Sequence, residues 1–61
     1  MNFTYFNNTY EILDITDECD KRPNRNQLIL NDFNYCFSVG DHGTIRNRIS
    51  QGLMWGWLKK I

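Results

Sequence analysis

Large apolar residues alternate with small polar ones in the middle of the chain, over residues 27–39. The alternating positions are Phe33, Tyr35, Phe37 and Val39. A period of two places all four side chains on one face of a β-strand. Ile29 also begins a helical i+4 stripe with Phe33 and Phe37, but aromatic and β-branched residues are poorer helix formers, so the pattern favours the strand.

Two further apolar runs lie in residues 3–16, on either side of Asn7 and Asn8. Asparagine tolerates left-handed backbone angles, so this pair predicts a two-residue hairpin turn between two strands. Neither face of the second run is purely apolar, which indicates a strand that is partly buried on both sides.

Residues 17–26 read as a polar loop, because charged residues and asparagine replace the apolar pattern there. Pro23 also disfavours helical angles at the residue before it. We expect this loop to be solvated, and the alternative is a binding loop that presents Arg22 and Arg25.

The segment Ser38–Arg48, S-V-G-D-H-G-T-I-R-N-R, predicts a tight turn. Gly40 and Gly43 can adopt positive φ angles without steric cost, and the Asp41 side chain can close the turn with a hydrogen bond. We expect one strand to end before this turn and another to begin after it, because the residues that follow are β-branched.

The string V-G-D-H-G-T-I in this segment resembles the turn of SH3-like small barrels of the KOW type. The resemblance implies a barrel shape and brings no catalytic residue with it. The predicted fold class is all-β, with residues 1–61 forming a single small domain. Its architecture is a small SH3-like barrel or a twisted antiparallel sheet of about five strands.

Residues 44–61 admit two interpretations. As strands, T-I-R-N-R-I-S and L-M-W-G-W-L-K-K-I are joined by a turn at Gln51–Gly52. As a helix, with Asp41 or Thr44 available near its N-cap, the segment carries an apolar i+4 stripe. The stripe consists of Ile45, Ile49, Leu53, Trp57 and Ile61. Gly52 and Gly56 each cost about 1 kcal/mol inside a helix, which favours the strands. The helix gives the alternative fold, α+β with an N-terminal hairpin and a C-terminal helix.

The formal net charge is zero, but the charges are unevenly distributed. Residues 1–20 hold five acidic residues and no Lys or Arg, whereas residues 42–61 hold four basic residues and no acid. The basic residues are Arg46, Arg48, Lys59 and Lys60. A near-neutral total weakens the case for tight nucleic-acid binding, because counterion release scales with the number of basic contacts. A nucleic-acid-binding protein that uses the basic C-terminal segment is our second functional hypothesis.

The sequence lacks the patterns of catalytic and metal sites. His42 is the only histidine and Cys19 and Cys36 are not in C-x-x-C spacing, so one chain cannot complete a structural zinc site. There is no Ser-centred elbow and no phosphate-binding glycine loop with its lysine. We expect His42 to face water in the turn. We therefore predict neither an enzyme nor a bound cofactor or metal.

No charged segment precedes an apolar run at the N-terminus, and no apolar run approaches the ~20 residues that span a bilayer. These features predict a cytoplasmic protein with reduced thiols and no membrane contact. The chain lacks alanine and is rich in asparagine and isoleucine, a bias typical of AT-rich genomes such as those of many phages.

Aromatic and basic residues form the candidate binding site. If the predicted strands pair, Trp55 and Trp57 share one face near Tyr35, with Arg46 and Arg48 beside them. Trp, Tyr and Arg dominate interface hot spots, and the same set can stack a base and clamp its phosphate. The alternative is that both tryptophans fill the core.

Our first functional hypothesis is a non-enzymatic binding module that binds a host protein, in the manner of a small phage-type accessory or inhibitor protein. The third is an oligomer whose subunit interface traps a nucleotide-like ligand between Trp and Arg. A domain of this size buries only about 60% of the surface of its unfolded chain, which favours self-association or a tight partner.

Overall fold

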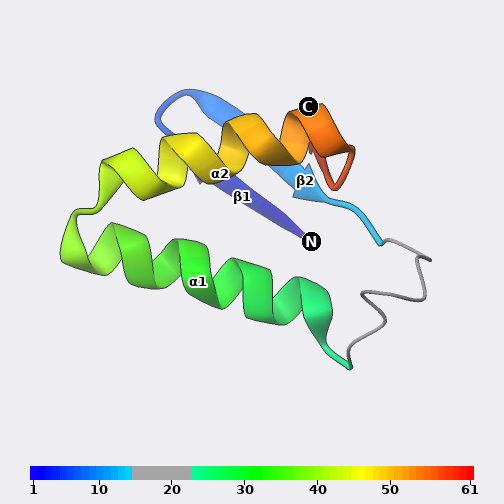
Figure 1. The fold of residues 1–61 in the computed structure, drawn as a ribbon, viewed down its shortest axis with the longest axis horizontal. Helices are drawn as coiled ribbons and strands as arrows, with labels where there is room; N and C mark the ends of the chain where they lie inside the picture. Colours follow the sequence, from blue (N-terminus) through cyan, green and yellow to red (C-terminus); the bar gives the residue numbers. More distant parts are fainter. Residues whose placement is uncertain (15–22) are drawn as a thin grey trace.

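The computed structural model describes residues 1–14 and 23–61 and has an α+β architecture (Figure 1). The elements are β1 (Asn2–Tyr5), β2 (Asn8–Ile12), α1 (Arg25–Val39), α2 (His42–Trp55) and β3 (Leu58–Lys60). The strands form one antiparallel sheet in the order β1-β2-β3. The two helices pack against one face of this sheet, so the fold has two layers.

The predicted all-β fold is therefore wrong, and the α+β alternative is confirmed. The SH3-like barrel implied by V-G-D-H-G-T-I is not formed, because that string connects two helices instead of two strands. The chain does reverse direction in this segment, so the turn was placed correctly and its flanking elements were not.

Helix α1 occupies most of the segment that the alternating pattern assigned to a strand. Its inward face follows the helical period, with Phe33 and Cys36 buried and Ile29 partly buried against the core. Tyr35 and Val39, which the strand interpretation placed inward, are 67% and 56% exposed. The segment folds as a helix because its helical apolar positions can all face the sheet. The alternating residues point to different sides of a helix.

Helix α1 ends at Gly40, whose φ angle of 74° lies in the left-handed region that glycine adopts without strain. The backbone N–H of Gly40 donates to Phe37 O at 3.2 Å, and that of Asp41 donates to Cys36 O at 2.9 Å. Asp41 is then the N-cap of α2. Two residues thus close one helix and open the next, which gives the helices their antiparallel arrangement (Figure 1).

The N-terminal hairpin is confirmed, with its turn one residue earlier than expected. Phe6 and Asn7 form the connection, and Asn8 is already the first residue of β2. In the resulting register Phe3 lies opposite Tyr10 on the buried face, and Thr4 lies opposite Thr9 on the open face. The open face is polar, and the hydroxyl oxygens of the two threonines lie 3.2 Å apart.

The core lies between the sheet and the two helices and is strongly aromatic. Phe33 is 1% exposed, and its ring stacks on Phe3 with a centroid distance of 4.3 Å. The buried cluster consists of Phe3, Tyr5, Tyr10, Ile12, Phe33, Cys36, Ile45, Ile49 and Leu58. Every element contributes to it, so no helix or strand can be removed without exposing this cluster.

Arg25 is not presented by a loop, as the binding-loop alternative for residues 17–26 required. It is the first residue of α1 and is buried, and its guanidinium donates to Leu13 O at 3.3 Å and to Asn26 Oδ1 at 3.0 Å. Arg22, the other residue of that alternative, lies outside the described residues.

Two glycines allow β3 to return along α2. Gly56 has a φ angle of 86° and ends the helix, its N–H donating to Gly52 O at 2.9 Å. The stripe predicted for the helical alternative is therefore buried at Ile45 and Ile49 but does not continue as helix to Trp57. Gly52 lies inside α2, where a Cβ atom would come within 2.7 Å of Leu58 side-chain carbons. The missing side chain at Gly52 is what lets β3 pack so closely.

We expect Gly52→Ala to destabilise the protein by about 1–3 kcal/mol, because the added methyl overpacks the contact with Leu58. Gly43→Ala is the matched control, since a Cβ there meets only Asp41 Oδ1 at 3.9 Å. That control is expected to leave stability unchanged or raise it by up to about 1 kcal/mol through helix propensity. Urea denaturation followed by circular dichroism measures both, and equal effects of the two variants would contradict the packing role of Gly52.

Candidate functional site

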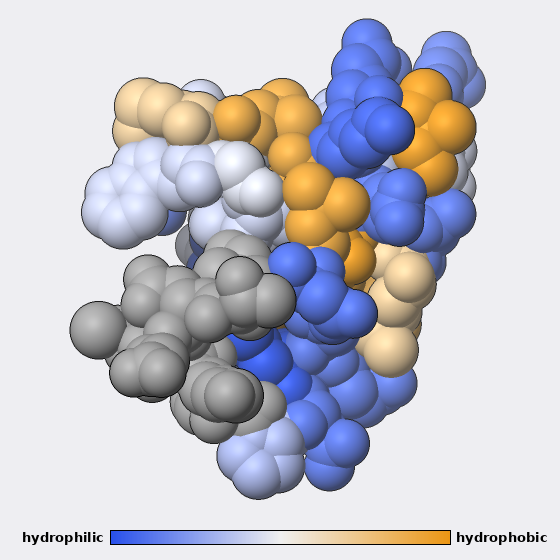
Figure 2. Space-filling model, turned by 90° about the vertical axis from the view of Figure 1, so that its right-hand side faces the viewer, coloured by the Kyte–Doolittle hydropathy of each residue, from blue (hydrophilic) through white to orange (hydrophobic). Residues whose placement is uncertain are grey.

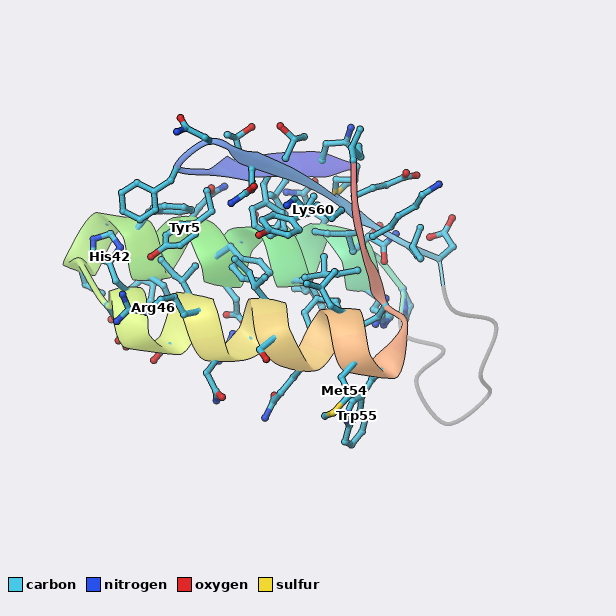
Figure 3. All side chains as sticks on the ribbon, turned by 90° about the horizontal axis from the view of Figure 1, so that it is seen from above. Tyr5, His42, Arg46, Met54, Trp55 and Lys60 are labelled. Carbon is cyan, nitrogen blue, oxygen red and sulfur yellow. The ribbon has the colours of Figure 1, made fainter. Side chains whose placement is uncertain are left out.

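A groove of about 310 Å³ lies between the β1–β2 hairpin and α2. We call it the hairpin groove. It is lined by Tyr5, Phe6, Asn8, Tyr10, Arg46, Ile49, Ser50 and Leu53. Figure 3 shows the labelled Tyr5, His42 and Arg46 gathered at the end of the molecule where the hairpin turn approaches the first turn of α2.

The helical side of the groove follows directly from the period of α2. Arg46, Ser50 and Leu53 are spaced i, i+4 and i+7, which places them along one side of the helix. Ile49 is buried between them and the core, so it forms apolar floor. On the strand side, Tyr5 and Tyr10 come from the buried face of the sheet. The groove is thus the edge of the same interface that forms the core.

Phe6 stands at the rim of the groove in an unusual backbone conformation. Its φ angle is 53°, in the left-handed region that costs an L-residue about 1–2 kcal/mol. Its side chain is 74% exposed. The ring contacts Tyr5 edge-on at a centroid distance of 4.6 Å and lies 6.1 Å from the His42 ring. A strained residue whose ring faces solvent is not explained by core packing, and such positions cluster at functional sites.

A hydrogen bond joins the hairpin to the start of α2. The Tyr5 hydroxyl lies 3.3 Å from His42 Nδ1, and the two rings have a centroid distance of 6.0 Å. His42 is exposed, as expected, but it is the first residue of a helix and has this partner. The contact holds the hairpin turn, and with it Phe6, against α2.

Asp41 fixes the first turn of α2 and therefore the direction in which His42 and Arg46 point. Its carboxylate accepts hydrogen bonds from the Thr44 N–H at 3.2 Å and from Thr44 Oγ1 at 2.6 Å. These hydrogen bonds from Thr44 lower the pKa of Asp41 below its usual value, and the positive charge of Arg48 adds to the effect. The carboxylate is thus stabilised in its charged form as a helix N-cap.

The two arginines predicted to share a binding site differ in their surroundings. Arg48 donates to Asp32 Oδ2 at 2.9 Å and so connects α2 to α1. Arg46 lines the hairpin groove, and among the described residues no hydrogen bond or ion pair engages it. Of the four basic residues of the C-terminal segment, Lys59 lies opposite Glu11 in the sheet register. The basic segment is therefore divided over different parts of the surface.

The aromatic residues of the predicted site are also separated. Tyr35 projects from α1, while Trp55 ends α2. Trp57 is partly buried against the core, 6.3 Å from the Phe33 ring. The expectation that both tryptophans lie on one face is wrong. Helix α2 ends at Gly56 between them, and the chain changes direction there. Of the five predicted site residues, only Arg46 lines the groove.

Met54 and Trp55 form a second exposed apolar feature, at the last turn of α2. They are 73% and 76% exposed and project away from the sheet in Figure 3. Figure 2 shows this end of the molecule, where orange hydrophobic atoms run through the upper half between blue hydrophilic ones. Trp55 follows Arg48 by seven residues and so lies on the α1 side of the helix, across from the groove.

Seven of the eight residues that line the groove were not predicted as site residues, and Phe6, Tyr5 and Tyr10 are the aromatic ones among them. The hairpin turn was predicted one residue too late. Phe6 was therefore assigned to a strand instead of to the rim of the groove. Tyr5 and Tyr10 carried no signal of their own, because alternating aromatic residues in a hairpin indicate core. Only the packing of α2 beside the hairpin makes them groove residues.

Comparisons of this chain with protein-family models, with curated proteins and with solved structures found no match. Within residues 1–14 and 23–61, no three His, Cys, Asp or Glu side chains gather where they could hold a metal ion. Neither α1 nor α2, the helices of the described part of the chain, is long and apolar enough to cross a membrane.

We expect Asp41→Ala to lower the Tm at neutral pH, because Thr44 loses its capping partner. The pKa of Asp41 is lowered by folding, so its contribution to stability is present above the usual value of 3.8 and is lost as the pH falls through the lowered pKa. The Tm difference between wild type and variant should therefore shrink in acid. Asp41→Asn is the control, since asparagine still caps a helix but carries no titrating charge. An unchanged Tm for Asp41→Ala at neutral pH would contradict the capping role.

We also expect the two tryptophans to differ in fluorescence. In Trp57→Phe, the remaining Trp55 should emit at long wavelength and be quenched readily by iodide, because it is 76% exposed. In Trp55→Phe, the partly buried Trp57 should emit at shorter wavelength and resist iodide. Circular dichroism checks that both variants fold, and equal quenching of the two would argue against this placement.

Proposed function

We propose that this chain is a non-enzymatic protein-binding module whose binding site is the hairpin groove. The observation that carries the proposal is Phe6, which is strained, 74% exposed and located at the rim of an aromatic groove. Interface hot spots favour aromatic residues and arginine around a pocket that excludes water, and this groove combines both.

The groove has a suitable size for one side chain of a partner protein. At about 310 Å³ it lies at the lower end of small-molecule pockets, so it accommodates about one large side chain. A standard interface buries about 800 Å² per partner, close to a fifth of the 4427 Å² that this chain exposes. A partner protein would therefore anchor one side chain in the groove and cover the neighbouring surface of α2 and the hairpin.

The charge distribution argues against nucleic acid as the partner. Arg48 is paired with Asp32, and Lys59 lies opposite Glu11. Among the residues that the structure describes, Arg46 and Lys60 are the exposed basic residues without an acidic neighbour of this kind, and Arg46 lies in a groove too small to follow a nucleic-acid backbone. Counterion release would then contribute little, so the affinity for the true partner should depend only weakly on salt.

The other hypotheses receive less support from the arrangement of residues. A nucleotide trap needs a Trp beside an unpaired Arg, but Trp55 lies across α2 from Arg46, and Arg48, on the same side as Trp55, is paired with Asp32. For a cysteine nucleophile, Cys36 is buried, and Cys19 lies outside the described residues. His42 Nδ1 is engaged with the Tyr5 hydroxyl.

The proposal is tested by selecting a displayed peptide library on the immobilised protein. Wild type should enrich a consensus that Phe6→Asn does not enrich, because the variant removes the rim ring. Asparagine tolerates the left-handed conformation, so we expect the stability of Phe6→Asn to lie within about 1 kcal/mol of wild type. Tyr35→Ser is the matched control, since Tyr35 is similarly exposed but lies on α1 outside the groove.

The expected outcome is the same consensus on wild type and on Tyr35→Ser. Peptides enriched equally on Phe6→Asn would place the binding surface elsewhere and contradict the proposal, as would the absence of any enrichment on wild type. Repeating the binding of the best peptide in increasing salt tests the electrostatic argument, and a steep loss of affinity would favour a charged polymer instead.

A further inference from the structure

Each polar side chain that lines the hairpin groove can donate a hydrogen bond, and one of them, Arg46, can only donate. Arg46 supplies a guanidinium, Asn8 an amide, and Ser50 and Tyr10 hydroxyl groups. No acidic residue is among the lining residues. A guanidinium has no acceptor atoms, so the charged group at this site can only donate.

The Tyr10 hydroxyl is partly accessible, although the residue as a whole is buried. Tyr10 is 7% exposed, yet no hydrogen bond to its hydroxyl occurs among the described residues. Within the same part of the chain, no buried side-chain oxygen or nitrogen lacks a partner, so this hydroxyl is not fully buried. Tyr10 is also one of the residues that line the groove. A bound group could therefore accept a hydrogen bond from it.

Arg46 is available because each acid of the described chain either has another partner or lies on a different face of the molecule. Asp32 pairs with Arg48, Asp41 accepts from Thr44, and Asp14 accepts from Asn26 at 2.6 Å. Glu11 lies on the open face of the sheet, opposite Lys59. An anion from outside would meet Arg46 without displacing an internal partner.

Apolar surface lies beside these donors. The Phe6 ring and the Leu53 side chain, which is 43% exposed, stand at the rim, and Ile49 forms floor. A ligand that fills about 310 Å³ must therefore satisfy both an apolar wall and a cationic donor. Arginine recognises planar carboxylates through two parallel hydrogen bonds, which matches the one charged group in the groove.

We infer that the hairpin groove binds a carboxylate that is carried next to a large apolar side chain of the partner protein. The inference rests on the proposed function for its choice of a protein partner. The carboxylate lies on the Arg46 guanidinium, with Tyr10, Ser50 and Asn8 as neighbouring donors. The apolar side chain packs between Phe6 and Leu53. The carboxylate comes from an acidic side chain or from the C-terminus of the partner.

The test uses three small probes and the full chain, with binding followed by NMR chemical-shift changes. The probes are acetyl-phenylalanine with a free carboxylate, its neutral amide, and acetyl-phenylalanyl-glutamate amide. Wild type should bind acetyl-phenylalanine at least about tenfold more tightly than the amide, which corresponds to one charge-assisted hydrogen-bonded pair. Tighter binding of the glutamate probe than of acetyl-phenylalanine assigns the side-chain source, and the reverse assigns the terminus.

Three variants separate charge from shape, and a fourth, Tyr35→Ser, is the control. Arg46→Gln should abolish the preference for the carboxylate while leaving amide binding in place. Arg46→Lys, which keeps the charge but lacks the planar pair of donors, should retain only part of the preference. Phe6→Asn should weaken all three probes alike, and Tyr35→Ser should change none of them.

Failure of the carboxylate inference can be distinguished from failure of the proposed function. Equal binding of acid and amide by wild type overturns the carboxylate inference, and it leaves the proposed function standing if Phe6→Asn still loses both probes. Shifts confined to residues outside the groove, or no binding by any probe, also overturn the inference. The proposed function then depends on the peptide selection alone.

Discussion

The stack between Phe3 and Phe33 is the contact on which the remaining structure depends. It joins the first strand to the middle of α1 at a centroid distance of 4.3 Å, and Phe33 is the least accessible ring of the core. Tyr10 extends the stack along the sheet at 5.5 Å from Phe3, and Trp57 reaches Phe33 from the C-terminal segment at 6.3 Å. In a chain this short, few apolar residues are available, and large rings bury the most surface per residue. Three regions distant in sequence, the N-terminal hairpin, α1 and the C-terminal segment, therefore meet on one aromatic centre.

Closing the fold around that centre places strict demands on the end of α2. The helix must stop within one residue and turn back, which Gly56 allows, and β3 must then pass the helix at short range, which Gly52 allows. Leu58 thereby reaches the position opposite Ile12 and completes the buried face of the sheet. Because β3 is only three residues long, it leaves the hairpin end of the sheet beside α2 uncovered, and the groove lies there.

The N-terminal hairpin and the turn at Gly40 could be predicted from the sequence, because each depends on local conformational preference, and Asp41 was one of two N-cap candidates in the helical alternative. The identity of α1 could not. Phe33, Tyr35 and Phe37 alternate as in a strand, yet the buried set is Ile29, Phe33 and Cys36, and only the sheet decides which period is used. Gly52 and Gly56 misled for a related reason. Their cost in a helix was counted as if both were interior and unpacked, whereas one ends the helix and the other contacts Leu58.

The candidate site was harder to predict than the fold, because its residues become neighbours only through tertiary packing. Arg46 could be nominated from residue type, but nothing in the sequence separates it from Arg48, which the fold assigns to Asp32. Phe6 illustrates the same limit from the other side. Local preference predicts the left-handed turn position at the asparagine that follows Phe6. In the structure Phe6 itself occupies the left-handed position. Stability alone would favour glycine or asparagine there, since a Phe6 ring that is 74% exposed recovers little burial energy. Phe6 lowers the stability of the fold and faces solvent at the rim of a groove. A contact with a partner molecule best explains such a residue.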